Sequence, residues 1–155
     1  MDVLLERERK DVPWVVDKLI GDIERRGMNL FVIVLTHVGL DEVGLYRVPG
    51  SVSSIKALTA ALNSGEDVDM DDDRWIDVNV VAGTFKSWLR ELPDSILTPA
   101  LYDQFILAAG LHDYEEKCYT VKNLVHQLPK GNFSLLKQVI RHLKRYLKAW
   151  HMSNW

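Results

Sequence analysis

The sequence predicts an all-α protein, a helical bundle of about six helices. Three observations support this fold class. Apolar residues recur with the i, i+3, i+4, i+7 spacing of one helix face in six successive segments. Residues that favour helix ends, such as Asp, Pro and Gly, stand at the borders of these segments. The connections between them are short and polar, and no internal repeat or low-complexity linker interrupts the chain.

The first expected helix carries its apolar face on Val12, Val15, Val16, Leu19, Ile20 and Ile23. Asp11 and Pro13 suit the start of a helix. Arg25 and Arg26 followed by Gly27 suit its end, because cations and a left-handed residue both satisfy the last carbonyl groups. We therefore expect this helix to end near Gly27.

The second and third helices are expected on either side of an acidic stretch. The second begins near Ser51 and stops at residues 63–65, with an apolar face of Val52, Ile55, Leu58 and Leu62. The third runs from about Asp77 to Leu92, where Pro93 ends it. Its expected buried residues are Val78, Val81, Phe85, Leu89 and Leu92.

Three further helices follow in the second half of the chain. Thr98 and Pro99 suit an N-cap and first helical position, and they open a fourth helix that continues to Gly110. Asp113 and Glu116 resemble a capping box for a fifth helix. Its expected apolar face is Tyr114, Cys118, Val121, Val125 and Leu128. The sixth helix is expected to start near Asn132 and to carry Leu136, Val139, Ile140, Leu143, Leu147 and Trp150.

One segment does not fit the helical pattern. Residues 29–38, NLFVIVLTHV, are rich in β-branched residues and would be assigned to a strand from propensity alone. A single strand in a helical domain has no partner. The segment is therefore a helix extension, a buried loop or a poorly packed insertion.

Composition limits the classes of function. The chain has 155 residues, 47% of them hydrophobic and 26% charged, as in ordinary globular proteins. Its net charge of -3 gives no general attraction for nucleic acid or anionic lipid. The longest apolar run, LFVIVL, is too short to span a bilayer, and Cys118 is the single cysteine. We therefore expect a cytoplasmic chain without membrane insertion or disulfide bonds.

Enzymatic motifs and metal-ligand patterns are not found. The chain has no GxxxxGK[ST] loop, and its five histidines lack metal-ligand spacing. Read as a calcium loop from Asp67, the acidic stretch has Asp72 where glycine is needed and Val78 where glutamate is needed. We expect this stretch to be a solvated acidic loop anchored by Trp75 or Ile76. No metal site is predicted, and Cys118 is expected to be a small core residue.

The stretch GLYRVPG, residues 44–50, places one permanent charge in an apolar loop bounded by glycines. Tyr46 and Val48 favour burial, whereas Arg47 does not. Arg47 is either a surface arginine whose charged end reaches solvent or a group held out for an anionic partner. The residues of the loop alone leave both readings open.

The third helix carries a polar stripe opposite its apolar face. Asn79, Gly83, Lys86 and Arg90 follow a 4-3-4 spacing, which places all four on one side. Lys86 and Arg90 are like charges one turn apart, and neither has an acid three or four residues away within the helix. The stripe is either a hydrated cationic surface or a binding site for an anionic partner.

Three blocks of sequence together resemble the signature of the RhoGAP domain, the GTPase-activating module for Rho-family small G proteins. These blocks are GLYRVPG, DVNVVAGTFKSWLRELPDSILTPALYDQF and LPKGNFSLLKQVIRHL. Their order matches the family, as does the separation of about forty residues between Arg47 and Lys86. The opening PWVVDKLIGDIERRG is similar to the family's first core helix. The resemblance covers most of the chain.

The resemblance implies an all-helical fold and a Rho-family small GTPase as partner. Arg47 matches the arginine-finger position, which stabilises the transition state of GTP hydrolysis in the partner's site. Lys86 and Arg90 match two basic residues that support the finger loop and contact the G protein. GTP and magnesium would belong to the partner, so this chain would need no cofactor and have no active site of its own. We expect it to act as a monomer.

The chain departs from the family pattern at two places. Residues 29–38 insert roughly ten residues upstream of the finger loop. The family's Met-(Ser/Thr)-x-x-Asn motif begins at Met152 and Ser153, but its asparagine would fall just beyond Trp155, and Asn154 does not replace it. We expect residues 1–10 to be an N-terminal extension and residues 11–155 to be a RhoGAP-like domain that lacks its final segment.

Two further interpretations remain beside GTPase activation. The departures favour a catalytically inactive module that binds a small GTPase or another protein without accelerating hydrolysis. A weaker interpretation is a misfolded fragment without activity.

Overall fold

The computed structural model describes residues 12–36, 44–65 and 67–153. Within these ranges the chain forms six α-helices and one short 3₁₀ helix, with no strand, so the prediction of an all-α protein is confirmed. The chain divides into two compact units. Within the described residues, the first unit contains residues 14–36, 44–65, 67–91 and 140–153, and the second contains residues 12–13 and 92–139. The predicted extension, residues 1–10, lies outside the described residues.

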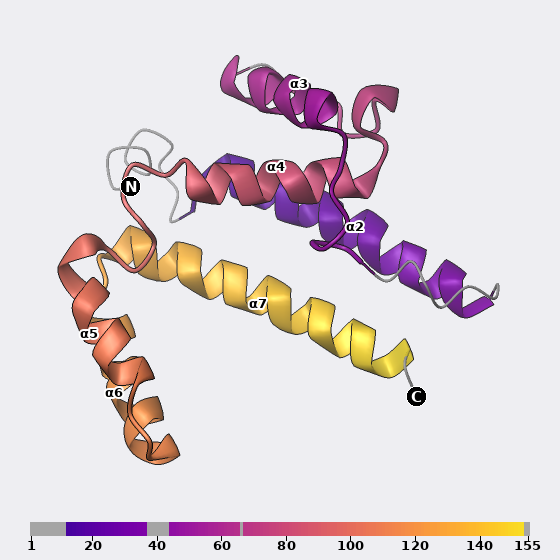
Figure 1. Cartoon of the computed structure of the whole chain (residues 1–155). Helices are drawn as coiled ribbons and strands as arrows, with labels where there is room; N and C mark the ends of the chain where they lie inside the picture. Colours follow the sequence, from indigo (N-terminus) through magenta and orange to yellow (C-terminus); the bar gives the residue numbers. More distant parts are fainter. Residues whose placement is uncertain (1–11, 37–43, 66, 154–155) are drawn as a thin grey trace. The chain divides into compact units, whose positions relative to one another are not determined.

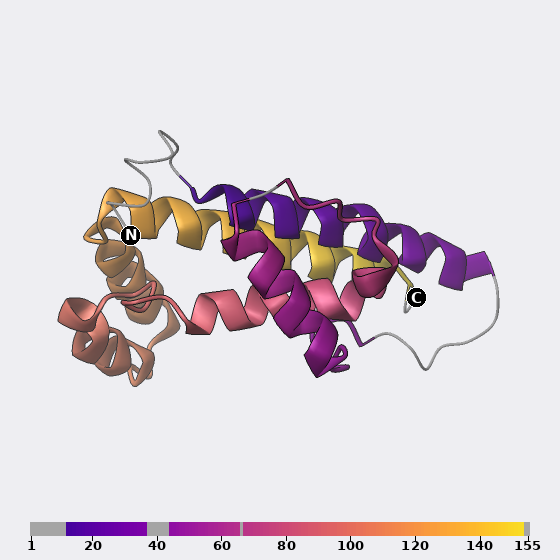
Figure 2. The same ribbon diagram turned by 90° about the horizontal axis from the view of Figure 1, so that it is seen from above.

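The first unit contains α2 (Trp14–Thr36), α3 (Val52–Asn63), η1 (Asp73–Trp75) and α4 (Val78–Arg90), together with the second part of α7 (Lys130–Ser153). α2 and α4 lie against each other, and α3 lies across α4 (Figures 1 and 2). This crossing is close because Gly83 has no side chain. A Cβ atom at Gly83 would lie 2.5 Å from Cδ1 of Ile55.

The core of the first unit is built from one apolar face of each of its helices. Its fully buried residues include Val16, Leu19, Ile23, Leu58, Trp75, Val81 and Phe85. Most of them belong to the predicted apolar faces of these helices, and their burial supplies the main driving force for packing. The core thereby fixes α4, which carries the predicted basic stripe.

The first predicted helix is longer than expected. α2 continues through Gly27 to Thr36, so the predicted end near Gly27 is wrong. A glycine inside a helix costs only about 1 kcal/mol relative to alanine, and each further residue adds a backbone hydrogen bond. Of the three readings of residues 29–38, the helix extension holds for residues 29–36, whereas residues 37 and 38 lie outside the described residues.

Three predicted helix starts carry a side-chain cap. Ser51, Asp77 and Asp113 are the N-caps of α3, α4 and α6, and their side chains accept from Ser54 N, Asn79 N and Glu116 N, respectively. Thr98 occupies the predicted N-cap of α5 but makes no side-chain cap bond, because its backbone has φ of +59°. α7 begins at Lys130, two residues before the predicted start near Asn132.

The second unit is formed by α5 (Pro99–Ala109), α6 (Tyr114–His126) and the first part of α7. α5 and α6 form a hairpin (Figure 1). The amide of Asn132, itself buried, donates to the carbonyl oxygen of Ile96 at 3.0 Å and holds the connection before α5.

Cys118 is exposed, so its predicted place in the core is wrong. The buried residue of α6 is Leu124, and Leu128 is buried two residues after the helix ends. Since successive residues are separated by about 100° around a helix, Cys118 lies about 120° around α6 from Leu124, away from the buried side.

The acidic loop between α3 and α4 is anchored by Trp75, which was one of the two residues predicted for this role. Trp75 is 2% exposed and its indole N–H donates to the carbonyl oxygen of Asp69 at 2.8 Å, whereas Ile76 is 55% exposed. The carboxylates of the loop form ion pairs. Asp67 pairs with Lys18, Asp71 with Arg25, and Asp72 with Arg74. Hydrogen bonds from Arg74 lower the pKa of Asp72 to about 2.

Candidate functional site

Residues 44–50, here called the Arg47 loop, form a tight turn with Arg47 at its exposed side. The amide groups of Arg47 and Val48 both donate to the carbonyl oxygen of Gly44, at 2.7 Å. Tyr46 has φ of +72°, in the left-handed region, which costs a residue with a side chain on the order of 1 kcal/mol. This geometry directs the chain so that Tyr46 is partly buried and Arg47 is exposed.

Gly50 fixes the end of the Arg47 loop against α4. A Cβ atom at this position would lie 2.6 Å from the backbone nitrogen of Val80 and 2.7 Å from the carbonyl oxygen of Asn79. Backbone atoms in the first turn of a helix cannot move aside readily. Glycine is therefore required here for close approach, and it places the loop directly on the first turn of α4.

Tyr46 attaches the Arg47 loop to α7. Its ring makes edge contacts with His142 and Tyr146, each at a centroid distance of 5.8 Å. The hydroxyl group of Tyr146 donates to the carbonyl oxygen of Leu45 at 3.3 Å. Of the two residues predicted to favour burial, Tyr46 is partly buried, whereas Val48 is 41% exposed and does not pack as expected.

Lys86 connects α4 to the Arg47 loop. Its ammonium group Nζ donates to the carbonyl oxygen of Tyr46 at 2.9 Å, and the side chain is partly buried. A hydrogen bond from a charged donor is about twice as strong as one between neutral groups. The bond is made to the residue directly before Arg47, so it fixes the backbone from which the guanidinium group extends.

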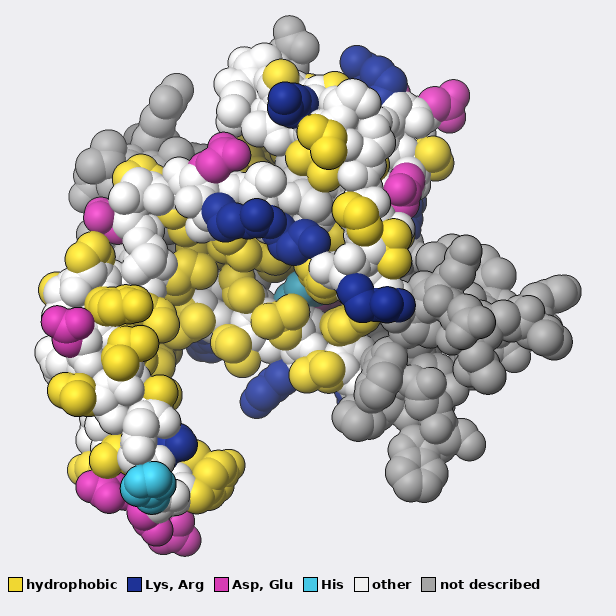
Figure 3. Space-filling view, viewed as in Figure 1, with side chains coloured by type: hydrophobic (Ala, Val, Ile, Leu, Met, Phe, Trp, Pro, Cys, Tyr) yellow, Lys and Arg dark blue, Asp and Glu magenta, His cyan; other side chains and the backbone are white. Residues whose placement is uncertain are grey.

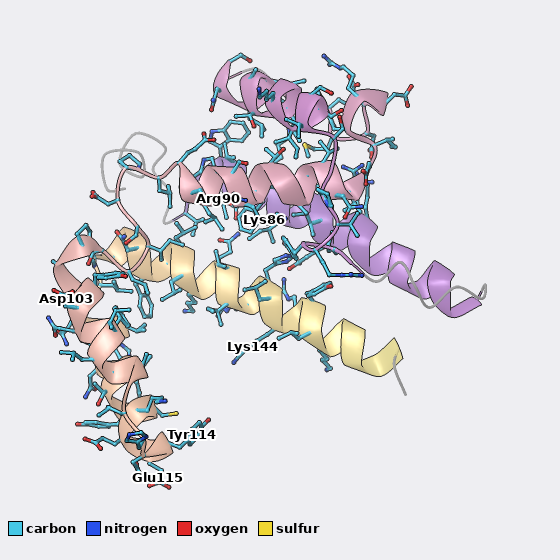
Figure 4. The ribbon with its side chains drawn as sticks, viewed as in Figure 1. Lys86, Arg90, Asp103, Tyr114, Glu115 and Lys144 are labelled. Atoms are coloured by element: carbon cyan, nitrogen blue, oxygen red, sulfur yellow. The ribbon has the colours of Figure 1, made fainter. Side chains whose placement is uncertain are left out.

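Arg90 lies one helical turn beyond Lys86 and is exposed. Its Nε donates to the carbonyl oxygen of Lys86 at 3.3 Å. Figure 4 shows both side chains on the same edge of α4, and Figure 3 shows basic side chains gathered along this helix. Of the predicted stripe, Gly83 is buried against Ile55 of α3 and so does not belong to a polar surface. Lys86 and Arg90 differ from each other, because Lys86 binds the loop backbone and Arg90 is exposed.

His142 lies beneath the Arg47 loop and is 2% exposed. Its Nε2 is hydrogen-bonded to the hydroxyl of Tyr46, and its Nδ1 lies 3.0 Å from Oε1 of Glu24. Arg145 donates to both oxygens of Glu24, at 3.1 and 2.8 Å. The pKa of Tyr46 is raised, chiefly because burial disfavours the phenolate and also because of the nearby Tyr146 and Glu24.

The sequence predicted three residues of this site and missed its buried support. Arg47, Lys86 and Arg90 lie in one unit, on the loop and on α4. His142 and Glu24 were not singled out. One signal was available, because His142 falls within the apolar stripe that contains Leu135 and Val139, and a polar residue at such a position needs a partner.

A metal site is not supported by the described residues. Within residues 12–36, 44–65 and 67–153, no group of three His, Cys, Asp or Glu side chains could hold a metal ion. Across the same ranges, none of the helices has the length and apolar character needed to cross a bilayer.

Comparisons with known proteins identify relatives over almost the whole chain. The profile of the RhoGAP domain matches residues 13–154. GTPase-activating protein BEM2 of Eremothecium gossypii is 40% identical over 149 residues, which cover 90% of this chain and 7% of that protein. Rho GTPase-activating protein 15 of Mus musculus is 33% identical over 145 residues, which cover 94% of this chain and 28% of that protein. This chain spans less than a third of either relative.

Solved structures agree with these relatives. The crystal structure of human Rho GTPase activating protein 15 matches with a TM-score of 0.83 at 32% identity, over 96% of this chain and 64% of that chain. The BH domain from Graf, the GTPase regulator associated with focal adhesion kinase, matches with a TM-score of 0.72 at 26% identity, over 90% of this chain and 68% of that one.

Proposed function

This chain belongs to the RhoGAP domain family, and on that premise we propose that it accelerates GTP hydrolysis by a Rho-family small GTPase. Arg47 acts in trans as an arginine finger. The observation that carries the proposal is an exposed arginine on a loop whose backbone is bound by Lys86 through a 2.9 Å hydrogen bond. Relatives named as GTPase-activating proteins support the same activity.

Fast GTP hydrolysis by a small GTPase requires a positive charge that a second protein inserts into its active site. Small GTPases hydrolyse GTP slowly because charge on the transferring phosphoryl group is incompletely stabilised. A guanidinium group remains charged and offers a planar set of donors that match phosphate oxygens. In the related Ras system, such a finger increases the hydrolysis rate by about 10³–10⁵-fold.

The two basic residues of α4 take different parts in this proposal. Lys86 holds the Arg47 loop, since its ammonium group is already bound to the carbonyl oxygen of Tyr46. Arg90 is exposed and contacts an acidic surface of the GTPase. Exposed Val48 and Pro49 beside Arg47 widen the surface that approaches the partner.

The proposal also covers cofactors, oligomeric state and location. GTP and magnesium are bound by the GTPase, so this chain needs no cofactor and has no active site of its own. It acts as a monomer in the cytoplasm, where its single cysteine remains reduced and Rho-family GTPases are the partners. It does not bind nucleic acid, which its net charge of -3 would disfavour.

Single-turnover GTP hydrolysis by a panel of Rho-family GTPases tests the proposal. We expect the wild-type chain to accelerate hydrolysis by at least one member. Arg47→Ala should lose most of the acceleration while binding is kept, and Arg47→Lys should recover little because a point charge lacks the guanidinium fork. Arg74→Ala is the matched control, since Arg74 is an exposed arginine whose ion pair is with Asp72 in the acidic loop.

Three other results would contradict the proposed function, and each would point to a different role for this chain. Full acceleration by Arg47→Ala would remove Arg47 from the mechanism. Binding without acceleration by the wild-type chain would identify a module that docks on the GTPase without activating it. A wild-type chain that shows no binding and no cooperative thermal transition would be an inactive fragment.

A further inference from the structure

We propose that His142 is a positioning residue for the Arg47 loop, and that it acts through Tyr46. The inference rests on the proposed function only for its effect on hydrolysis. The placement of the loop can be measured without a GTPase.

His142 lies at the meeting point of three segments that are far apart in the sequence. Its Nε2 contacts the hydroxyl of Tyr46 in the loop, and its Nδ1 lies 3.0 Å from Glu24 on α2. Its ring also makes an edge contact with Phe85 of α4, at 6.3 Å and 89°. Because the imidazole is held on both nitrogens and on its ring, it offers Tyr46 a fixed partner.

The partners of His142 determine where its proton lies. Tyr46 keeps its hydroxyl proton, because burial raises the pKa of this group. The carboxylate of Glu24 can only accept. In the neutral imidazole that fits these two partners, Nδ1 carries the proton and donates to Glu24, and Nε2 accepts from the hydroxyl of Tyr46. This arrangement satisfies both ring nitrogens, and no buried side-chain nitrogen or oxygen in the described residues lacks a partner.

Glu24 is itself held in place, so the support is continuous from α2 to the loop. Arg145 donates to both of its carboxylate oxygens. The side chain of Glu24 is 21% exposed and that of Arg145 is 60% exposed, so this ion pair contributes orientation more than stability. Arg145, His142 and Tyr146 all lie on α7, so this helix contacts Leu45 through Tyr146 and Tyr46 through His142, whereas Lys86 of α4 binds the carbonyl oxygen of Tyr46.

The position of Tyr46 matters for its neighbour because Tyr46 has φ of +72°. A residue with a side chain adopts this conformation only where surrounding contacts enforce it. If the hydrogen bond to His142 is lost, Tyr46 can relax toward negative φ, and the direction of Arg47 then changes. The expected consequence is a lower maximal rate of hydrolysis, with little change in affinity for the GTPase.

Two conservative substitutions of His142 test its two hydrogen bonds one at a time. In His142→Gln, the side-chain amide reaches the place of Nε2 and can still bind Tyr46. In His142→Asn, the shorter amide reaches the place of Nδ1 and can still bind Glu24 but not Tyr46. Loss of one such hydrogen bond predicts a fall of about five- to ten-fold in maximal rate for His142→Asn. His142→Gln should stay within about twofold of wild type, since it keeps the bond.

Amide hydrogen exchange of the free protein provides the second measurement. The amides of Arg47 and Val48, which donate to Gly44, should exchange faster in His142→Asn than in His142→Gln. Leu58→Ala is the control, because Leu58 is fully buried on α3 and is outside the His142 contacts. This variant should lower the thermal midpoint without changing either the exchange of the loop or the maximal rate at temperatures well below that midpoint.

The outcomes distinguish the inference from the proposed function. Equal rates and equal loop exchange in the Asn and Gln variants would overturn the positioning role. If the wild-type chain accelerates no GTPase, the proposed function fails, and the exchange measurement alone decides whether His142 holds the loop. A fall in affinity without a change in maximal rate would also overturn the inference.

Discussion

Lys86 on α4 binds the carbonyl oxygen of Tyr46, which lies 40 residues earlier in the chain, at 2.9 Å. The bond joins the middle of a well-packed helix to the residue directly before Arg47. Phe85, the neighbour of Lys86, is 2% exposed, so the backbone that carries the ammonium group is fixed by the core. The position of the Arg47 loop is therefore coupled to the packing of α4.

Substitution of Lys86 by methionine is expected to lower the maximal rate of stimulated GTP hydrolysis by about ten-fold or more. Hydrogen bonds to charged groups contribute about 1.5–3 kcal/mol, and 1.4 kcal/mol corresponds to a factor of ten. Single-turnover hydrolysis at saturating protein measures this rate. Lys56→Met is the matched control, since Lys56 is exposed on α3, and it should retain the wild-type rate. Equal rates for the two variants would contradict a supporting role for Lys86.

Arg90→Met should affect association instead of the maximal rate. Arg90 is exposed, and interactions of exposed charges across an interface mainly change the association rate and its dependence on salt. We expect a lower association rate at low ionic strength and a weaker decrease as salt is added. Stopped-flow association at several salt concentrations makes the comparison, and an unchanged salt dependence would leave Arg90 as hydrated surface.

Much of the fold was predictable because it depends on local patterns. The starts of α3, α4 and α6 were recognised from Ser51, Asp77 and Asp113, whose side chains cap the helices that follow them. The end of α2 was not recognised. Gly27 is a common stop signal, but the cost of one glycine is small beside the gain from continuing a long helix.

The candidate site was predictable to the extent that the resemblance named its residues. Arg47, Lys86 and Arg90 were all identified. The sequence did not predict that Lys86 and Arg90 have different contacts, which only the three-dimensional structure shows. The bond from Lys86 to Tyr46 and the contact between His142 and Tyr46 join residues 40 and 96 positions apart. Neither separation follows from helix periodicity.

Alkaline conditions should destabilise the protein through Tyr46. Burial raises its pKa above the ordinary value of 10.0, so the folded state holds this proton more tightly than the unfolded chain does. The resulting contribution to the free energy of unfolding is complete below about pH 10 and is lost as the pH rises above that value. Urea unfolding across this range should show a shallower decline for Tyr46→Phe than for wild type. Tyr119→Phe, which removes an exposed hydroxyl, should follow the wild-type decline, and identical slopes for all three proteins would refute the assignment.

Two glycine-to-alanine substitutions should have opposite effects on stability. In Gly50→Ala, the added Cβ would lie 2.6 Å from the backbone nitrogen of Val80, so either α4 or the Arg47 loop must shift. Overpacking of this kind costs about 1–3 kcal/mol, and the displaced loop should also reduce stimulated hydrolysis. Gly21 lies within α2 and a Cβ there would meet no atom within 4 Å, so Gly21→Ala should stabilise the chain by up to about 1 kcal/mol. Urea unfolding measures both changes, and hydrolysis should be unchanged in Gly21→Ala. Because the substitution is chemically the same at both positions, a similar change in stability for the two variants would show that contact with α4 does not constrain Gly50.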